Sequence, residues 1–370
     1  MSILHLYMLP GCLLLGFATG LVMHRSDFCV AGMFRDLFLF RSTFMLKALM
    51  LLILVSIPFF EAARLTGLVK YPFPLFATPS LANVIGGMFF GIGMVLAGGC
   101  VVGTLYKMAA GRFPSLLAFL GLVAGSSLYA EIHPYWSVFS RTVSLPTKAV
   151  TVPQLLELPS WLVSGPLLLV FSILVFRWFR RGQMIKPVVV DGYLQPWKAA
   201  ILLAVIGFFS VLLVGMPLGI TTAYSKMGAL LEQLLVPEHY NQVVYFGLYP
   251  LQYIPPVGGG LLRGGPGASL DGIALIQFPL IAGIILGAAF SAWRLGEWRI
   301  QFSLPMRQVF SALSGGIIMG LASRMAPACN IWHLMGGLPI LAMQSILFLA
   351  GLLPGAWLGG VLLSRLVLPK

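Results

Sequence analysis

Four cysteines are the residues of this sequence best suited to chemistry, and none of them belongs to a CxxC pair. They stand at positions 12, 29, 100 and 329, each in apolar or glycine-rich surroundings. A disulfide framework or a zinc site needs paired cysteine spacings, so neither is indicated. A thiol is a weak S–H donor and a soft, polarisable contact for another sulfur atom. We therefore expect cysteine chemistry with no metal and no cofactor.

Three ionisable residues lie in or beside apolar segments and are candidates to assist the cysteines. Arg324 falls inside an apolar, glycine-rich stretch, where an ionisable side chain is a functional candidate by default. His333 follows Cys329 by four residues, a spacing that puts both on one helix face; it is either a proton site or polar gate, or a hydrogen-bonded structural histidine. Arg25 either attracts an anion or marks the cytoplasmic end of an apolar segment.

The composition indicates that membrane helices must position these residues. The chain has 370 residues, of which 59% are hydrophobic and 9% charged, whereas soluble proteins have about 25% charged residues. The ten-residue alternation of a β-barrel is absent from the sequence. We therefore expect an all-α, polytopic integral membrane protein in contact with lipid. The net charge of +13 is explained by basic residues in short loops, so no nucleic-acid partner is expected.

The stretch from Gly86 to Gly103 is the element around which the chain is organised. It is apolar, dense in glycine, and contains Gly98, Gly99 and Cys100 at its break. Only about 20 Å of helix fits between Gly86 and Gly99, against a bilayer core of about 30 Å. We expect a re-entrant half-helix that stops inside the membrane and delivers Cys100 beside the small backbone of Gly99.

A second copy of this stretch lies near the C-terminus. GGMFFGIGMVLAGGC (86–100) and GGIIMGLASRMAPAC (315–329) share the initial glycine pair, a later glycine and the final cysteine at one constant offset. The distribution of basic loops makes the opening spans 3–23 and 199–217 run in opposite directions. We therefore predict an internal inverted repeat within one transmembrane domain, with halves 1–198 and 199–370, an arrangement typical of transporters.

The basic residues also predict the orientation of the chain. Placing the run around residues 177–198 in the cytoplasm puts every other short basic loop on the same side. The N-terminus is then external and the C-terminus cytoplasmic. The first apolar segment, Ile3 to Met23, is too long for the core of a signal peptide and lacks a preceding basic region, so we expect it to be retained as a span.

Three segments resemble the YeeE/YedE family of bacterial membrane proteins, whose better-understood branch imports thiosulfate. They are HRSDFCVAGMFRD (24–36), GGMFFGIGMVLAGGCVVGTLYK (86–107) and GGIIMGLASRMAPACNIWH (315–333). The resemblance implies a location in the bacterial inner membrane and about nine transmembrane helices plus half-helices. It also implies a narrow substrate path lined by Cys29, Cys100 and Cys329. Cys12 matches no motif.

The third motif departs from the family pattern. Pro327 and Ala328 precede Cys329 where the family usually has two glycines, and Asn330, Trp332 and His333 follow it. A bulkier and more polar third gate is compatible with a different sulfur or selenium solute.

Three functions remain after these observations. The first is a transporter that imports thiosulfate or a related small inorganic sulfur anion. It would not be an enzyme and would have no catalytic residues. The sequence contains no ATP-binding GxxxxGK[ST] loop. The alternative is a membrane sulfurtransferase or thiol redox protein that passes persulfide sulfur or selenium to a cytoplasmic sulfur-carrier partner, with Cys29 beside Arg25 as the reactive thiol. A membrane anchor subunit would leave the cysteines, Arg324 and His333 unexplained.

Overall fold

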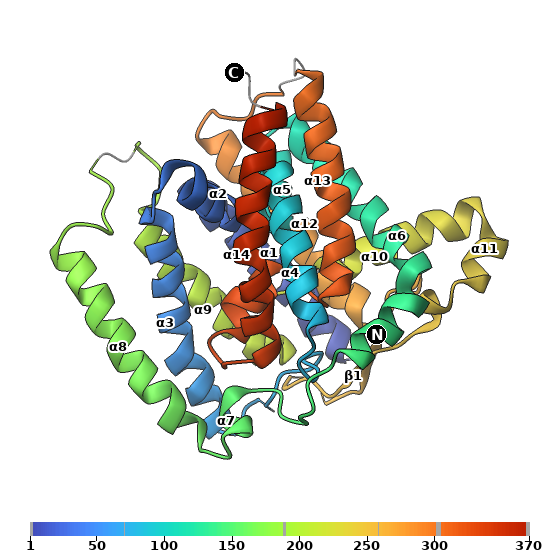
Figure 1. Ribbon diagram of the computed structural model, residues 1–370, viewed down its shortest axis with the longest axis horizontal. Coiled ribbons are helices and arrows are strands. Elements are labelled where there is room, and N and C mark those ends of the chain that lie inside the picture. The colour runs from blue at the N-terminus through green and yellow to red at the C-terminus, as the bar shows by residue number, and fades with distance from the viewer. Residues whose placement is uncertain (1–2, 70, 188–189, 258, 301–304, 368–370) are drawn as a thin grey trace.

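The computed structural model describes residues 3–69, 71–187, 190–257, 259–300 and 305–367 (Figure 1). Within these residues the chain is helical apart from loops and one short antiparallel pair, β1 (Leu251–Tyr253) and β2 (Leu262–Gly264). Eight of the described helical segments are long and apolar enough to cross a membrane. The prediction of an all-α, polytopic membrane protein is therefore confirmed.

Eight helices precede residue 196. They are α1 (Ile3–Ser26), α2 (Val30–Phe40), α3 (Phe44–Leu65), α4 (Ala82–Leu96), α5 (Val101–Ala109), α6 (Phe113–Thr142), α7 (Val152–Leu155) and α8 (Ser160–Arg180).

The elements after residue 195 begin with α9 (Pro196–Val214), α10 (Thr221–Leu235), α11 (Pro237–Gln242) and the 3₁₀ turn η1 (Val244–Gly247). The long helices α12 (Gly272–Arg294), α13 (Met306–Met325) and α14 (Met343–Leu362) follow β2, with the π-helical turns η2 (Trp332–Gly337) and η3 (Leu363–Val367). Helix α13 is long enough to cross a membrane but less apolar than the eight candidate spans.

Two of the candidate spans are interrupted in their course. The first, Leu6–Phe40, is broken between α1 and α2, and the third, Ala82–Ala109, is broken between α4 and α5. Helix α4 has 15 residues, about 22 Å of helix, so it stops short as the glycine-rich sequence predicts. Gly98 makes the turn with φ +69°, a left-handed conformation that glycine adopts without a steric penalty.

Helices α4, α6, α13 and α14 pack at very short distances because glycine replaces a side chain at each crossing. A Cβ added at Gly125 of α6 would lie 2.0 Å from the carbonyl oxygen of Ile317 in α13. A Cβ added at Gly355 of α14 would lie 2.0 Å from the carbonyl oxygen of Met88 in α4. Such close approach of backbones is the usual way in which membrane helices associate.

These glycine contacts recur at nearly one offset along the chain. Met88 and Ile317 are 229 positions apart, as are Cys100 and Cys329, and Gly125 and Gly355 are 230 apart. The helix pairs recur in the same way. Helix α4 packs on α14, and its counterpart α13 packs on α6. Helix α1 packs on α12, and its counterpart α9 packs on α3. Helix α8 lies at the periphery of this arrangement (Figure 1).

The basic loops lie at one end of the molecule. Figure 1 shows the C-terminus, the start of α13 and the loop between α8 and α9 at the top, and α7 and β1 at the bottom. Helix α10 is buried at its start and exposed at its end.

Alanine at Gly125 or Gly355 should destabilise the protein by about 1–3 kcal/mol, because the added methyl group must push two backbones apart. The two losses should be similar, since the two contacts are equivalent. Gly207 of α9 is the control, because nothing lies within 4 Å of an added Cβ, and alanine there should be neutral or slightly stabilising. Thermal unfolding of the three purified variants in detergent measures these changes. If the Gly125→Ala and Gly355→Ala variants melt at the same temperature as the Gly207→Ala control, the close packing is contradicted.

Candidate functional site

The three cysteines of the recurring motifs each stand directly before a helix. Cys29 is the N-cap of α2 and Cys100 the N-cap of α5, and Cys329 precedes the short helical segment that starts at Asn330. All three are buried, with at most 3% of the residue exposed. The first backbone N–H groups of a helix lack partners within the helix and carry partial positive charge. Each thiol therefore lies beside a group of backbone donors.

Cys29 and Cys100 meet over Gly103. A Cβ added at Gly103 would lie 2.9 Å from the Cys29 sulfur and 3.2 Å from the Cys100 sulfur. The Cys100 Sγ accepts a hydrogen bond of 3.3 Å from the Gly103 N–H. The pair can exist only because residue 103 has no side chain.

Cys329 lies across a small void from the start of α5. It borders a void of about 10 Å³ together with Thr19 of α1 and Val102, the second residue of α5. Ile220, which directly precedes α10, lines the same void. Cys329 thus faces the first turn of the helix that Cys100 begins.

Cys12 lies in a different place. It borders a separate void of about 10 Å³, next to Ser210 of α9. This void and the one beside Cys329 share walls formed by Leu218 and Gly219. Cys12 thus lies behind the wall of the cysteine group, in agreement with its absence from the motifs.

Arg324 is a buried cation near the end of α13. Only 8% of the residue is exposed, and its guanidinium donates to the Thr222 hydroxyl at 3.0 Å and to the Thr221 hydroxyl. None of the ion pairs among the described residues includes Arg324. A buried charge without a counter-ion is costly, and it favours the approach of an anion. These surroundings support a functional role for Arg324.

His333 points away from the cysteines toward α14. Its Nδ1 is 3.0 Å from the Ser345 hydroxyl, and its ring stacks on Phe348 with 4.2 Å between ring centroids. These contacts favour the structural alternative for this histidine, although its Nε2 is without a partner among the described residues.

Arg25 precedes Cys29 by four residues, and Gly99 directly precedes Cys100. The Arg25 Nε is buried and unpartnered within the described part of the chain. A Cβ at Gly99 would lie 3.3 Å from the backbone nitrogen of Thr104 in α5, which is tight but less severe than at Gly103. The absence of a side chain at Gly99 therefore lets the turn between α4 and α5 pack closely against the first turn of α5.

A cavity of about 510 Å³ lies beside the loops that join α5 to α6 and α12 to α13. His24, Arg112, Tyr193, Glu297 and Arg299 are among its lining residues. The Tyr193 hydroxyl donates to the Glu297 carboxylate at 2.5 Å. Burial, followed by this hydrogen bond, raises the pKa of Tyr193 to about 12, so the hydroxyl stays neutral. The cavity is polar and carries more positive than negative groups.

Tyr106 separates this cavity from the cysteine pair. Its hydroxyl donates to Asp27 at 2.8 Å, and its ring lies edge-on to His24 with 6.4 Å between centroids. The same ring lies 3.9 Å from the Cβ position of Gly103, over which Cys29 and Cys100 meet. An aromatic ring held by a carboxylate thus forms the partition on this side.

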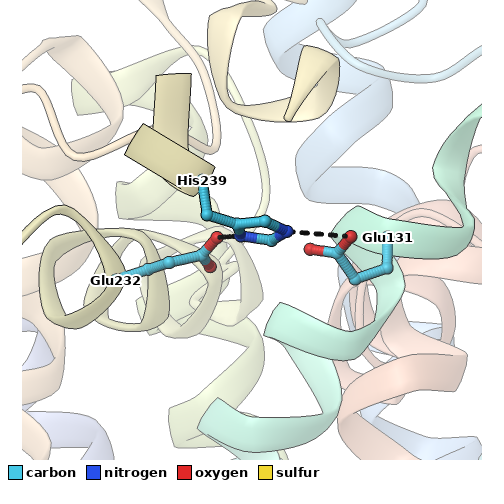
Figure 2. A group of neighbouring side chains, drawn as sticks. All are labelled: Glu131, Glu232 and His239. Carbon is cyan, nitrogen blue, oxygen red and sulfur yellow. Dashed lines mark hydrogen bonds and ion pairs between the residues drawn. The ribbon is translucent and has the colours of Figure 1, made fainter. Parts of the chain in front are cut away.

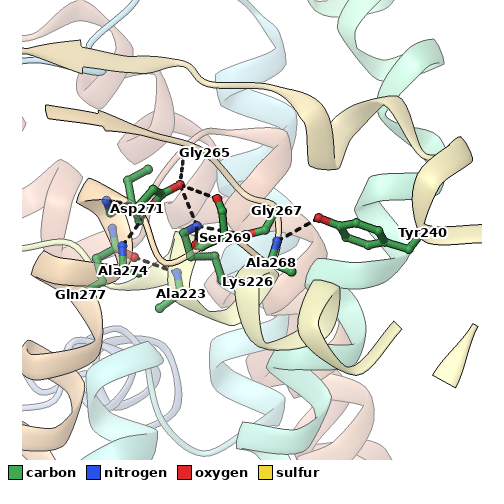
Figure 3. Close-up of polar contacts among 11 residues, drawn as sticks. Ala223, Lys226, Tyr240, Gly265, Gly267, Ala268, Ser269, Asp271, Ala274 and Gln277 are labelled. Carbon is green, nitrogen blue, oxygen red and sulfur yellow. Dashed lines mark hydrogen bonds and ion pairs between the residues drawn. The ribbon is translucent and has the colours of Figure 1, made fainter. Parts of the chain in front are cut away.

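The start of α10 is fixed by a buried lysine (Figure 3). Lys226 is completely buried and donates to the carbonyl oxygens of Gly267 and Ser269 and to the Asp271 carboxylate, at 2.7–2.9 Å. Asp271 also accepts from the first N–H groups of α12. This network ties α10 to α12 and so fixes the position of Tyr224, two residues before the lysine.

A second polar group lies far from the cysteines, where α11 projects from the molecule (Figure 1). His239 lies between two carboxylates, 2.6 Å from Glu232 and 3.7 Å from Glu131 (Figure 2). The carboxylates face opposite nitrogens of the ring, so a single ion could not bind the ring and both carboxylates without rearrangement. The trio joins α6 to α10 and α11.

Sequence reasoning missed Tyr106, Tyr224 and the Lys226–Asp271 pair. Tyr224 and Lys226 belong to a segment that reads as an ordinary amphipathic helix. Only the packing of α10 against α12 and α6 shows that they are buried.

Comparison with known proteins agrees with this geometry. The family model for sulphur transport matches residues 25–358. The chain is similar to a thiosulfate transporter, TsuA, of Spirochaeta thermophila, with 27% identity over 94% of this chain and 97% of the relative. It is also similar to the thiosulfate transporter TsuA of Escherichia coli, with 25% identity over 93% of this chain and 92% of the relative.

A third relative covers less of the chain. The probable transporter YedE of Escherichia coli is 32% identical over 46% of this chain and 41% of its own length. The match of the family model over nine-tenths of the sequence settles the identity: this multi-pass membrane protein belongs to the sulphur transport family, the family of YeeE and YedE.

Proposed function

We propose that this protein imports thiosulfate, or a closely related small inorganic sulfur anion, across the bacterial inner membrane along Cys29, Cys100 and Cys329. The observation that supports the proposal is that three buried cysteines each stand at the start of a helix, with Cys29 and Cys100 meeting over Gly103 and Cys329 bordering a void with the first turn of α5. Two relatives named as thiosulfate transporters align with more than nine-tenths of the chain, which supports the same solute.

The chemistry of the site suits a sulfur dianion. Moving a charge into apolar protein is costly unless hydrogen bonds or an opposite charge replace its hydration. Helix N-termini supply backbone donors, and thiols supply weak S–H donors with a soft surface for the terminal sulfur of thiosulfate. Because thiolates would repel the anion, transport requires neutral thiols. Several weak contacts in series hold an ion without trapping it.

The path is closed in this structure. The void beside Cys329 measures about 10 Å³, room for about one water molecule, whereas the inner cavity holds about 510 Å³. A thiosulfate ion therefore passes only when side chains such as Tyr106 move.

We further propose that residues 1–198 and 199–370 are inverted repeats, with their boundary in the first turn of α9. The recurrence of glycine contacts at offsets of 229 and 230 supports this duplication. The proposed orientation has the N-terminus outside and the basic end with the C-terminus in the cytoplasm, so the large cavity is the inner mouth.

The meeting of Cys29 and Cys100 over Gly103 favours one alternative, sulfur transfer to a cytoplasmic sulfur-carrier protein. In that reaction a cysteine thiolate attacks the outer sulfur of thiosulfate, the S–S bond breaks, and sulfite leaves with the electron pair. The persulfide then passes to the carrier. The burial of both thiols counts against it, because a reactive cysteine needs an accessible, electropositive site.

Replacement of Cys29, Cys100 or Cys329 by alanine should lower thiosulfate uptake about tenfold or more, which corresponds to the loss of about 1.4 kcal/mol. Uptake is measured in cells that lack other sulfate and thiosulfate importers, with Cys12→Ala as the matched control that retains transport. Thiosulfate labelled separately at each sulfur distinguishes the two functions: both labels enter together in transport, and only the outer sulfur enters in sulfur transfer. No uptake by the wild type would exclude thiosulfate as the solute.

Replacement of Arg324 by glutamine should raise the KM for uptake about tenfold, since the anion loses a cation worth about 1.4 kcal/mol. The double variant Thr221→Val with Thr222→Val removes the hydrogen bonds but keeps the charge, so it should leave the KM nearly unchanged. Arg307→Gln, in the exposed first turn of the same helix, is the control for surface charge. Equal KM values in Arg324→Gln and the wild type would remove this residue from the site.

A fluorescent protein fused to the C-terminus should fluoresce, and alkaline phosphatase fused there should be inactive, because the basic end faces the cytoplasm. The reverse pattern is expected for fusions after α3, in the loop that contains residues 66–81. Active phosphatase at the C-terminus would invert the proposed orientation and make the large cavity the outer mouth.

A further inference from the structure

Two buried polar side chains near the cysteines have no hydrogen-bond partner. The hydroxyl of Tyr224 and both amide atoms of Asn330 make no hydrogen bond of normal geometry with any described residue. Both residues are completely buried. A buried polar group without a partner costs about 1–3 kcal/mol, and native proteins rarely retain one without a reason.

The two side chains belong to the same place. Asn330 directly follows Cys329 in the chain, and Tyr224 stands about one helical turn after Ile220, which lines the void beside Cys329. Tyr224 is held rigidly, because Phe119 packs edge-on against its ring and Lys226 anchors its helix. Two unpartnered donors are thus held close to the void that Cys329 borders.

Comparison of the two recurring motifs shows that the amide of Asn330 replaces an apolar side chain. Asn330 follows Cys329 as Val101 follows Cys100, at the same offset of 229 positions. Val101 is completely buried and apolar. The first half shows that this position packs well with a hydrocarbon side chain, so packing alone does not require an amide in the second half.

We propose that Asn330 and Tyr224 are the polar recognition residues of the path: the Asn330 amide N–H and the Tyr224 O–H donate to the oxygen atoms of the oxyanion while the thiols contact its sulfur. The inference rests on the proposed function and assigns the part of the solute that the cysteines do not recognise. Neutral donors accept a dianion without binding it too tightly, as conduction requires. An ion without oxygen atoms, such as hydrosulfide, gains nothing from these two residues.

Asn330→Val, which copies the residue of the first half, and Tyr224→Phe, which removes only the hydroxyl, test the assignment in the purified full-length protein. Each should raise the Kd for thiosulfate about tenfold or more. Each should leave the melting temperature of the ligand-free protein unchanged or higher, because an unsatisfied buried group has been removed. The measurements are thermal unfolding in detergent with and without thiosulfate and a binding titration.

Tyr253→Phe is the matched control. Tyr253 is partly buried, and its hydroxyl donates to the Val214 carbonyl at 2.6 Å, so its loss should lower the melting temperature and leave the Kd unchanged. If Tyr224→Phe and Asn330→Val behave like this control, the two groups are structural and the inference is wrong. If thiosulfate does not raise the melting temperature of the wild-type protein, the proposed solute is wrong. The same variants are then compared with sulfite and with sulfate. If neither anion raises the wild-type melting temperature, the inference about Asn330 and Tyr224 is wrong as well.

Discussion

The contact of glycine with backbone carbonyl groups between helices is the constraint on which the rest of this structure depends. Four helices, α4, α6, α13 and α14, approach so closely that no Cβ fits at their crossings. This approach sets the depth at which α4 and α13 end, and hence the depth of Cys100 and Cys329. Membrane helices gain little from hydrophobic burial against each other, so van der Waals packing of this kind must supply the stability.

The cysteine group shows how a membrane protein can receive an anion without a dense cluster of cations. Helix N-termini, thiols and neutral donors surround the centre, and Arg324 lies beside it with no carboxylate partner among the described residues. The polar cavity of about 510 Å³ adds further positive charge at one end. In the transport function that we propose, charge attracts the solute at the margin of the path, and neutral groups bind it in the centre. This division avoids a deep binding well, which would slow passage.

Much of the fold and part of the site could be predicted from the sequence, for identifiable reasons. Composition predicts membrane helices, and the glycine-rich stretch before Cys100 predicts a helix that stops early, as α4 does. The partner of each glycine could not be predicted, because the carbonyl contacts join residues far apart in the chain, 192 positions for Gly125 and Ile317 and 267 for Gly355 and Met88. Tyr224 was missed because its burial depends on the Lys226 network, and that network arises only when α10 docks on α12.

The pairing of helices has a consequence for how the protein is made. The most extensive helix contacts, α1 with α12, α4 with α14 and α6 with α13, each join an early helix to a late one. At a synthesis rate of about 5–20 residues per second, α4 waits on the order of tens of seconds for α14. During that time its glycine face has no partner, and the broken span must be covered by other protein, such as the insertion machinery, because lipid cannot hydrogen-bond its exposed backbone groups. The helices around the cysteines therefore pack together only after the last helices have been synthesised, and not by the stepwise addition of finished helical hairpins.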